Sequence, residues 1–343
     1  MINHLVKTIS LKVRYLFSFV YLFVSMFGLM ACSETVEYEL KDSGMNAEGS
    51  SINWLDDERL IFMHSKNNIG MMSIWNTLTG GIELYAHEAL GGVCFSDNYI
   101  TYGIKNVDRT TYLKSGLIGS EKLIVFDWDD EEKAKYENNK YSCKRFIRPV
   151  EHNQEYIHYL KKEHGYLHIG PSIGKGFDYP VYVKNDGEKI QMPFLRTYYR
   201  KPIGYFPFNK AYFLWAVTGP DERWKQKCRN AWWLYPDGQT ESICVPLLEG
   251  INGGSVLFYP VVNGYLFISH ETGRGKDPGS SGIYFLDKNL NLKNKLVSGI
   301  ANGISISPDG CKVAFALNPE VKKSVSLKMI NICDPIQGEK LWH

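Results

Sequence analysis

The sequence Ile304-Ser305-Ile306-Ser307-Pro308-Asp309-Gly310 is followed closely by the apolar segment Val313-Ala314-Phe315-Ala316. The alternation of apolar and polar residues before the turn is typical of a strand with one buried face. The continuous apolar segment after the turn is typical of a strand that is buried on both faces. Pro-Asp-Gly favours a tight turn between the two. The stretch therefore predicts a β-hairpin whose second strand lies deep in a core.

The same order of segments recurs four times earlier in the chain. Each copy has a short alternating strand, a turn, an apolar strand and a third strand, and most have a candidate fourth strand. The first two strands of these copies fall within residues 52–63, 93–102, 203–215 and 256–268. Third strands are expected at 72–75, 123–128, 232–235, 283–286 and 327–332, and fourth strands at 82–85, 240–245, 292–297 and 339–342.

A sixth, degenerate copy is expected between the second and third, where the spacing of the copies is about twice the usual one. Its strands are expected within residues 156–160, 166–169, 179–183 and 189–192. Four-stranded units at this period are typical of a propeller, since radial stacking covers both faces of each small sheet. We therefore predict an all-β fold, a six-bladed β-propeller of four-stranded antiparallel blades. A pair of β-sandwiches or an irregular all-β domain is the alternative, and the best candidate helix is 154–164.

The turn Ser307-Pro308-Asp309-Gly310 before Val313-Ala314-Phe315 resembles the repeat of TolB-type and WD-like propellers. The resemblance covers this copy well, and it covers the other four clear copies only through their hydrophobic pattern. It implies the propeller fold and, for the TolB type, a role in assembly of the bacterial envelope.

The first 31 residues predict an export signal. Lys7, Lys12 and Arg14 precede an uncharged apolar run over residues 15–29, which is too short to span a bilayer. Leu29-Met30-Ala31-Cys32 resembles the lipobox of bacterial lipoproteins, which implies cleavage before Cys32 and lipidation of its thiol. An uncleaved N-terminal anchor helix is the alternative. We expect a signal peptide at 1–31, a tether at 32–50 and the propeller domain at 51–343.

Export also bears on charge and location. Removal of three basic residues leaves 36 Lys and Arg against 37 Asp and Glu, a net charge of −1. Such a chain lacks the positive charge with which proteins neutralise nucleic-acid phosphates, so nucleic acid is excluded as a partner. Ser33 follows the lipidated cysteine where an Asp resembles an inner-membrane retention signal. The resemblance therefore implies the outer membrane, with the domain on its periplasmic face.

An oxidising compartment favours disulfides among the remaining cysteines. Cys311 and Cys333 flank a predicted hairpin, and pairing them would set Val313 opposite Asn331, Phe315 opposite Met329 and Leu317 opposite Leu327. Cys228 and Cys244 flank the turn at 236–238 in a less favourable register and form the second candidate pair. The pairing of Cys94 and Cys143 stays open.

Two segments contain residue types used in catalysis or metal binding. Residues 170–174 match the G-x-S-x-G motif around a nucleophilic Ser172, but residues 175–180 cannot start the helix that this motif requires, which favours a glycine-rich loop. His152, His158, His164 and His168 lie close together in the sequence. They could bind a metal only by converging from a loop, so solvated histidines are favoured.

Two further features have an ordinary and a functional interpretation. The acidic run at residues 127–132 is expected to form a solvated loop, or else a contact patch for a basic partner. Trp224, Trp232 and Trp233 could stack on sugars, but core packing is favoured for them. We therefore predict no catalytic, metal-binding or cofactor-binding residues, and no cofactor.

The sequence predicts a non-enzymatic outer-membrane lipoprotein that binds a protein partner in the periplasm. One subclass resembles the lipoprotein immunity proteins that neutralise secreted antibacterial effectors, and it is preferred because the repeats diverge and their insertions are long. The alternatives are a TolB-like envelope assembly factor, or a propeller enzyme or binder that acts on glycans or lactones.

Replacement of Cys32 by serine, Cys32→Ser, tests the anchor. The variant lacks the thiol that accepts the lipid, so we expect it to accumulate as a precursor that carries residues 1–31. Metabolic labelling with a radioactive fatty acid checks this, and the wild type should fractionate with the outer membrane. Label retained on the variant would contradict the assignment of Cys32.

Overall fold

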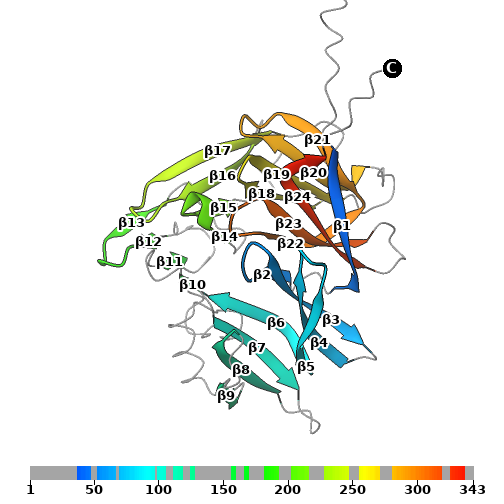
Figure 1. The fold of residues 1–343 in the computed structure, drawn as a ribbon. Helices are drawn as coiled ribbons and strands as arrows, with labels where there is room; N and C mark the ends of the chain where they lie inside the picture. The colour runs from blue at the N-terminus through cyan, green and yellow to red at the C-terminus, as the bar shows by residue number, and fades with distance from the viewer. Residues whose placement is uncertain are drawn as a thin grey trace, which may run out of the picture. The chain divides into compact units, whose positions relative to one another are not determined.

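The computed structural model describes residues 37–47, 52–66, 69–96, 99–105, 111–118, 124–127, 156–159, 166–169, 181–192, 202–215, 228–246, 255–270, 280–318 and 325–336. These residues form six four-stranded antiparallel sheets (Figure 1), and a 3₁₀ turn at Pro207–Asn209 joins two of the strands. The predicted all-β, six-bladed propeller is therefore confirmed.

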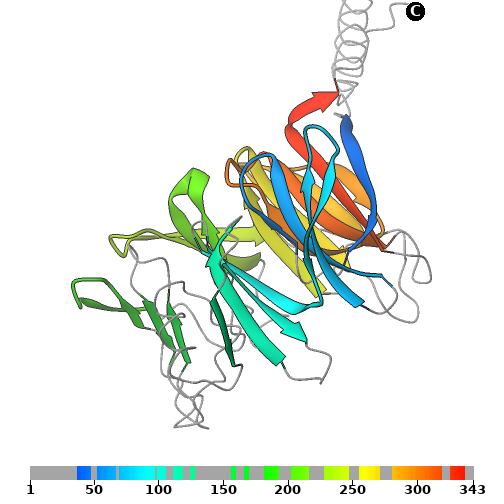
Figure 2. The same cartoon turned by 60° about the horizontal axis from the view of Figure 1, so that its bottom comes forward.

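We number the blades along the chain, and the second view shows the sheets following one another in chain order (Figure 2). Blade 1 contains β2 (Ile52–Trp54), β3 (Arg59–Lys66), β4 (Ile69–Asn76) and β5 (Ile82–His87), and blade 2 contains β6 (Ala89–Ser96), β7 (Tyr99–Lys105), β8 (Thr111–Leu117) and β9 (Ile124–Asp127). Blade 3 contains β10 (Tyr156–Tyr159), β11 (Tyr166–Ile169), β12 (Val181–Val183) and β13 (Lys189–Gln191), and blade 4 contains β14 (Pro202–Phe206), β15 (Ala211–Trp215), β16 (Cys228–Leu234) and β17 (Thr240–Pro246). Blade 5 contains β18 (Ser255–Val261), β19 (Gly264–His270), β20 (Gly282–Asp287) and β21 (Leu292–Ser298), and blade 6 contains β22 (Ile300–Ile306), β23 (Lys312–Asn318), β24 (Ser326–Ile336) and β1 (Glu37–Asn46).

The degenerate copy is confirmed as blade 3, whose four strands lie where the sequence predicts them. The predicted helix at 154–164 is wrong where it can be compared, because β10 pairs there with β11 as a strand. In blade 2 the predicted third strand at 123–128 is instead the fourth, β9. The true third strand is β8, Thr-Tyr-Leu-Lys-Ser-Gly-Leu, which has too few apolar residues to stand out in the sequence.

The second strand of a blade is apolar on both faces because each face packs against a different neighbouring blade. In β3, Leu60 and Phe62 join Ala314 and Leu327 of blade 6 in one core. Ile61, on the opposite face of the strand, packs with side chains of blade 2 in another core. Since each fully buried side chain of this size contributes about 1.5–3 kcal/mol, these two interfaces are a substantial part of the stability.

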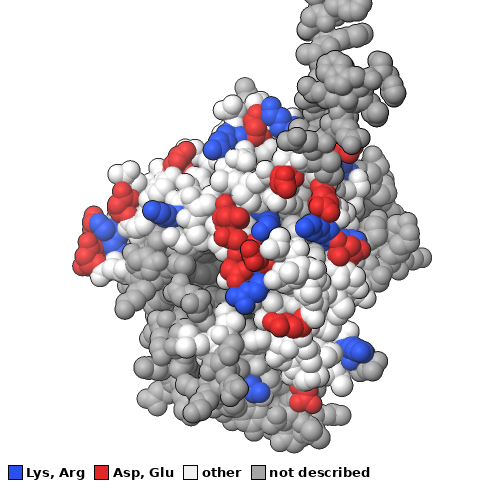
Figure 3. Space-filling view, in the orientation of Figure 1, with Lys and Arg blue, Asp and Glu red and all other residues white. Residues whose placement is uncertain are grey.

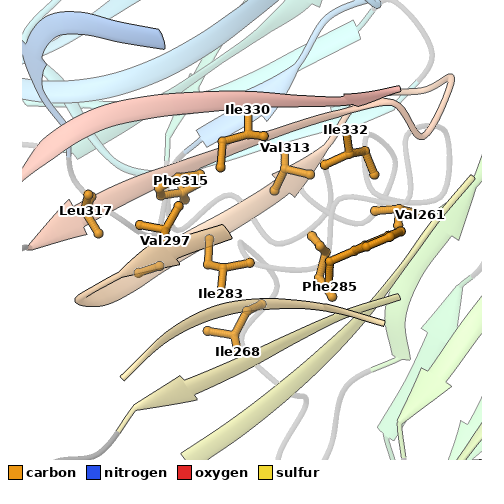
Figure 4. Packing of buried hydrophobic residues seen from close by; sticks show 12 residues of the cluster. Val261, Ile268, Ile283, Phe285, Val297, Val313, Phe315, Leu317, Ile330 and Ile332 are labelled. Carbon is orange, nitrogen blue, oxygen red and sulfur yellow. The ribbon is translucent and has the colours of Figure 1, made fainter. Parts of the chain in front are cut away.

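The same arrangement joins blades 5 and 6 (Figure 4). Ile268, Ile283 and Val297 of blade 5 meet side chains of blade 6 across this interface. The residues contributed by blade 6 include Val313, Phe315, Leu317, Ile330 and Ile332. Hydrophobic burial therefore continues from blade to blade.

The first described strand closes the ring. β1 pairs antiparallel with β24, with Glu37 opposite Ile336 and Asp42 opposite Lys328, so the two ends of the described chain share blade 6 (Figure 1). The Lys328 ammonium donates a hydrogen bond to the Asp42 carboxylate across this pair. The predicted fourth strand of this blade, 339–342, lies outside the described residues.

The predicted tether at 32–50 is therefore wrong for residues 37–46, which belong to the propeller. β1 was not recognisable in the sequence because its residues, Glu-Tyr-Glu-Leu-Lys-Asp-Ser-Gly-Met-Asn, include few apolar ones. Such a composition is usual for an edge strand, where charges discourage pairing with other chains. The propeller therefore includes β1 from Glu37 on, rather than beginning at residue 51.

The disulfide between Cys311 and Cys333 is confirmed, with a Cα–Cα distance of 5.2 Å. The predicted register is wrong by one residue: Val313 lies opposite Ile330, and Phe315 opposite Lys328. The prediction assumed that bonded cysteines face each other directly. Here the main chain of Cys311 instead faces Ile332, whose N–H donates to the Cys311 carbonyl oxygen at 2.8 Å, so the disulfide runs diagonally.

Cys244 is also disulfide-bonded, with a partner outside the described side chains. The pairing of β16 with β17 sets Cys228 opposite Pro246 and Cys244 opposite Asn230. The two cysteines of the second candidate pair are therefore not directly opposed.

Removal of the confirmed disulfide in the double variant Cys311→Ser/Cys333→Ser should lower the free energy of unfolding by about 3 kcal/mol, because the unfolded chain gains loop entropy. Chemical denaturation of the oxidised wild type and the variant measures this difference. Under reducing conditions the two should converge, and a difference that persists there would show that the serines act in another way.

Candidate functional site: the turn face

One end of the propeller carries the tight turns. In an antiparallel four-stranded sheet, the turn after the first strand and the turn after the third lie at the same end. We call this end the turn face, and the opposite end, where each blade connects to the next, the connection face. The described turns of the turn face are residues 55–58, 77–81, 184–188, 207–210, 235–239, 262–263, 288–291 and 307–311.

The turn at 307–311 is fixed by its own side chains. Asp309 Oδ1 accepts the N–H of Cys311 at 2.9 Å, and Ser307 Oγ accepts the N–H of Lys312 at 2.7 Å. The N–H of Gly310 donates to the Ser307 carbonyl oxygen at 2.8 Å. Ser307 itself is buried. The turn is therefore held in one conformation and can serve as a fixed contact point.

This turn joins blade 6 to blade 1. The N–H of Asp309 donates to Asp57 Oδ1 at 2.8 Å, and the Lys312 ammonium donates to the Asp57 carbonyl oxygen. Nearby, Trp54 Nε1 donates to the Ser305 carbonyl oxygen at 3.0 Å. Polar contacts thus reinforce the apolar core between the first and last blades.

The same turn also contacts blades 5 and 4. The N–H of Val262 donates to the Gly310 carbonyl oxygen at 3.2 Å. Gly310 has a φ of +76°, and a Cβ at this position would lie 2.7 Å from the Phe208 ring. Phe208 also contacts the Trp233 ring edge-on, with centroids 6.4 Å apart. Four blades therefore meet at this turn.

Carboxylates on the turn face mostly act as turn caps. Asp186, Asp237 and Asp287 each accept the N–H of the residue two positions later, at distances of 2.9–3.0 Å. Lys293, 2.9 Å from Asp287, together with the N–H of Asn291, lowers the pKa of Asp287 to about 2. These carboxylates therefore stabilise the local backbone of the turns.

The tryptophans occupy cores, as the sequence favoured. Trp232 packs in the core between blades 3 and 4, whereas Trp233 packs in the core between blades 4 and 5. Both are almost fully buried, so neither offers a ring face to a sugar. Trp224 lies outside the described residues.

The remaining candidates lie partly outside the described chain. Ser172, His152 and His164 are outside it, as is the acidic run after Asp127, the last residue of β9. In blade 3, His158 is opposite Leu167 and His168 is opposite Ile157, so the two histidines do not face each other across the pair. Within the described ranges, no three His, Cys, Asp or Glu side chains converge as metal ligands.

Sequence reasoning missed the residues through which the blades meet at this face. Asp57 lies in the turn between β2 and β3, which the sequence predicts only as a connection, and Phe208 lies in the turn that follows β14. The position of these turns in the repeat could have pointed to them. Turns that follow the first strand of each blade must lie at the same end of a closed ring.

Figure 3 shows acidic and basic side chains interspersed over one side of the molecule. None of the helices in the described part of the chain is long and apolar enough to cross a membrane.

Comparisons with known proteins support the fold alone. No family model and no curated protein matches the sequence. An oligogalacturonate lyase from Vibrio parahaemolyticus is similar in structure, with a TM-score of 0.50 and 11% identity over 86% of this chain and 97% of that one. A putative TolB from Agrobacterium tumefaciens has a TM-score of 0.38 and 11% identity, over 83% of this chain and 90% of that one. The propeller domain of the Trilobed protease from Pyrococcus furiosus has a TM-score of 0.33 and 14% identity, over 85% of each chain. The chain spans about half the length (46%) of the acylaminoacyl peptidases that it also matches.

The contact between Gly310 and Phe208 can be tested by Gly310→Ala. The alanine adopts a left-handed backbone at a cost of about 1–2 kcal/mol and also displaces Phe208, which adds about 1–3 kcal/mol. Gly80→Ala is the matched control, because Gly80 has a φ of +77° and nothing within 4 Å of its Cβ position. Urea unfolding should show the larger loss for Gly310→Ala, and equal losses would contradict the convergence of blades at this turn.

Proposed function

We propose that this chain is an outer-membrane lipoprotein whose propeller binds a protein partner in the periplasm without catalysing a reaction. The observation that carries the proposal is the position of β1. This strand closes the ring and begins at Glu37, shortly after Cys32, the residue expected to receive the lipid. The expected lipidation site and the first strand of the ring are thus close together in the sequence.

A closed ring is a suitable scaffold for binding another protein. β1 completes the last blade by pairing with β24, and blades 1 and 6 are joined by an apolar core and by the bonds to Asp57. A surface held in place by such a frame loses little conformational entropy when it binds, which favours affinity. Its variable connections supply specificity, because loops on a rigid scaffold vary without changing the fold.

The finer proposal is that the partner is a secreted antibacterial effector, which would make the chain an immunity lipoprotein. Divergence among the six repeats favours this class, because a surface adapted to one partner has no need to repeat itself around the ring. The length of connections such as 128–155 and 216–227 supports the same proposal. A TolB-like role in envelope assembly is the alternative binding function, and action on glycans or lactones is the enzymatic one.

The mature chain without residues 1–31 should bind its cognate effector, encoded beside it, with nanomolar affinity or better. Isothermal titration calorimetry measures this, with an effector from an unrelated system as the control. The same preparation should hydrolyse no ester, lactone or glycan. Turnover that is lost on substitution of a single carboxylate would show that the protein is an enzyme. Comparable binding of both effectors would contradict the immunity function.

A further inference from the structure

The chain enters the propeller at the turn face. β22 runs into the turn at 307–311, β23 leaves it, and β24 returns towards the same end. β1 pairs antiparallel with β24, and Glu37 is opposite Ile336, the last residue of that strand. Glu37 therefore lies at the turn-face end of blade 6.

The lipid on Cys32 would keep this end close to a bilayer. Cys32 and Glu37 are five residue steps apart, and a chain of five steps spans at most about 18 Å in any conformation. This reach is smaller than the thickness of the hydrocarbon core of a membrane, which is about 30 Å. The turn-face end of blade 6 thus stays near the lipid surface.

Exposed apolar side chains gather at this same end. Leu78 lies at the tip of the turn between β4 and β5 and is 70% exposed. Ile82 is the first residue of β5, Leu292 is the first residue of β21, and Leu40 lies near the start of β1. These residues belong to blades 1, 5 and 6. Blades 1 and 5 each pack directly against blade 6. Four exposed apolar side chains of blades 1, 5 and 6 thus lie at the end of the propeller at which the first described strand begins.

The Leu78 turn is rigid as well as exposed. Asn76 Oδ1 accepts the N–H groups of Leu78 and Thr79, both at 3.0 Å. The N–H and the hydroxyl of Thr77 both donate to the Glu58 carbonyl oxygen at 2.8 Å. These bonds hold a large apolar side chain in water, which is unfavourable unless another surface covers it.

We propose that the turn-face ends of blades 5, 6 and 1 rest on the lipid surface that holds Cys32, with Leu78 inserted at the boundary between headgroups and acyl chains. This proposal rests on the lipid anchor of the proposed function. It orients the ring, so that the connection face points towards the periplasm and is the face available to a partner.

Apolar contact rather than charge would hold this orientation. Glu37, Glu39 and Glu58 lie near the same end as Lys288 and Lys293, so the two signs are mixed. Recruitment by anionic lipids requires a cluster of basic residues, which this region lacks among its described side chains. The contact should therefore form on zwitterionic phosphatidylcholine.

The test uses the full lipidated chain in phosphatidylcholine vesicles that contain a nitroxide-labelled lipid. A fluorescent unnatural amino acid replaces Leu78 or, in the matched control, Ile69. Ile69 lies in the same blade at the connection face and is 49% exposed. We expect the nitroxide to quench the fluorophore at position 78 several-fold more strongly than at position 69.

Each other outcome has a defined meaning. Equal quenching, or stronger quenching at position 69, would overturn the orientation. Emission at position 78 that changes with protein density but not with the quencher lipid would assign the surface to a second copy and would also overturn it. Mass spectrometry of the Cys32 peptide is done first, because an unlipidated cysteine would refute the anchor of the proposed function rather than the orientation.

Discussion

The pairing of β1 with β24 is the constraint on which the rest of the propeller depends. A ring of small sheets has two free ends, and without closure the first and last blades would each expose an apolar face. Here the chain's first described strand completes the last blade, so opening the ring requires the loss of strand hydrogen bonds and of the core that contains Phe62 and Leu327. Closure at one blade therefore stabilises the interfaces at all the others.

The polar contacts at the turn face strengthen the same joint. Asp57 receives hydrogen bonds from the neighbouring blade, and the disulfide of Cys333 holds the end of β24 beside the turn at 307–311. Hydrophobic burial is not directional, so it brings blades together without fixing their exact rotation. The hydrogen bonds and the disulfide are directional, so they fix the rotation of the blades at the turn face.

Much of the fold could be predicted from the sequence, because middle strands such as β3, β15 and β23 are apolar on both faces. Even blade 3 was found from its spacing. The strands that the sequence did not reveal, β1 and β8, have few apolar residues, and an edge strand such as β1 needs little apolar surface. The turn-face contacts could not be predicted for another reason: Asp57 and Asp309, or Phe208 and Gly310, are distant in sequence and meet only when the ring closes.

Closure by the first strand also bears on the order of folding events. β1 is the first described strand to be synthesised, whereas its pairing partner β24 is synthesised last. Until then β1 has no sheet to join, and its charged sequence keeps it soluble and discourages pairing with other chains. Contacts between segments so far apart form slowly, because a long loop must close first. The ring can therefore close only after β24 has been synthesised, because blade 6 needs both ends of the described chain.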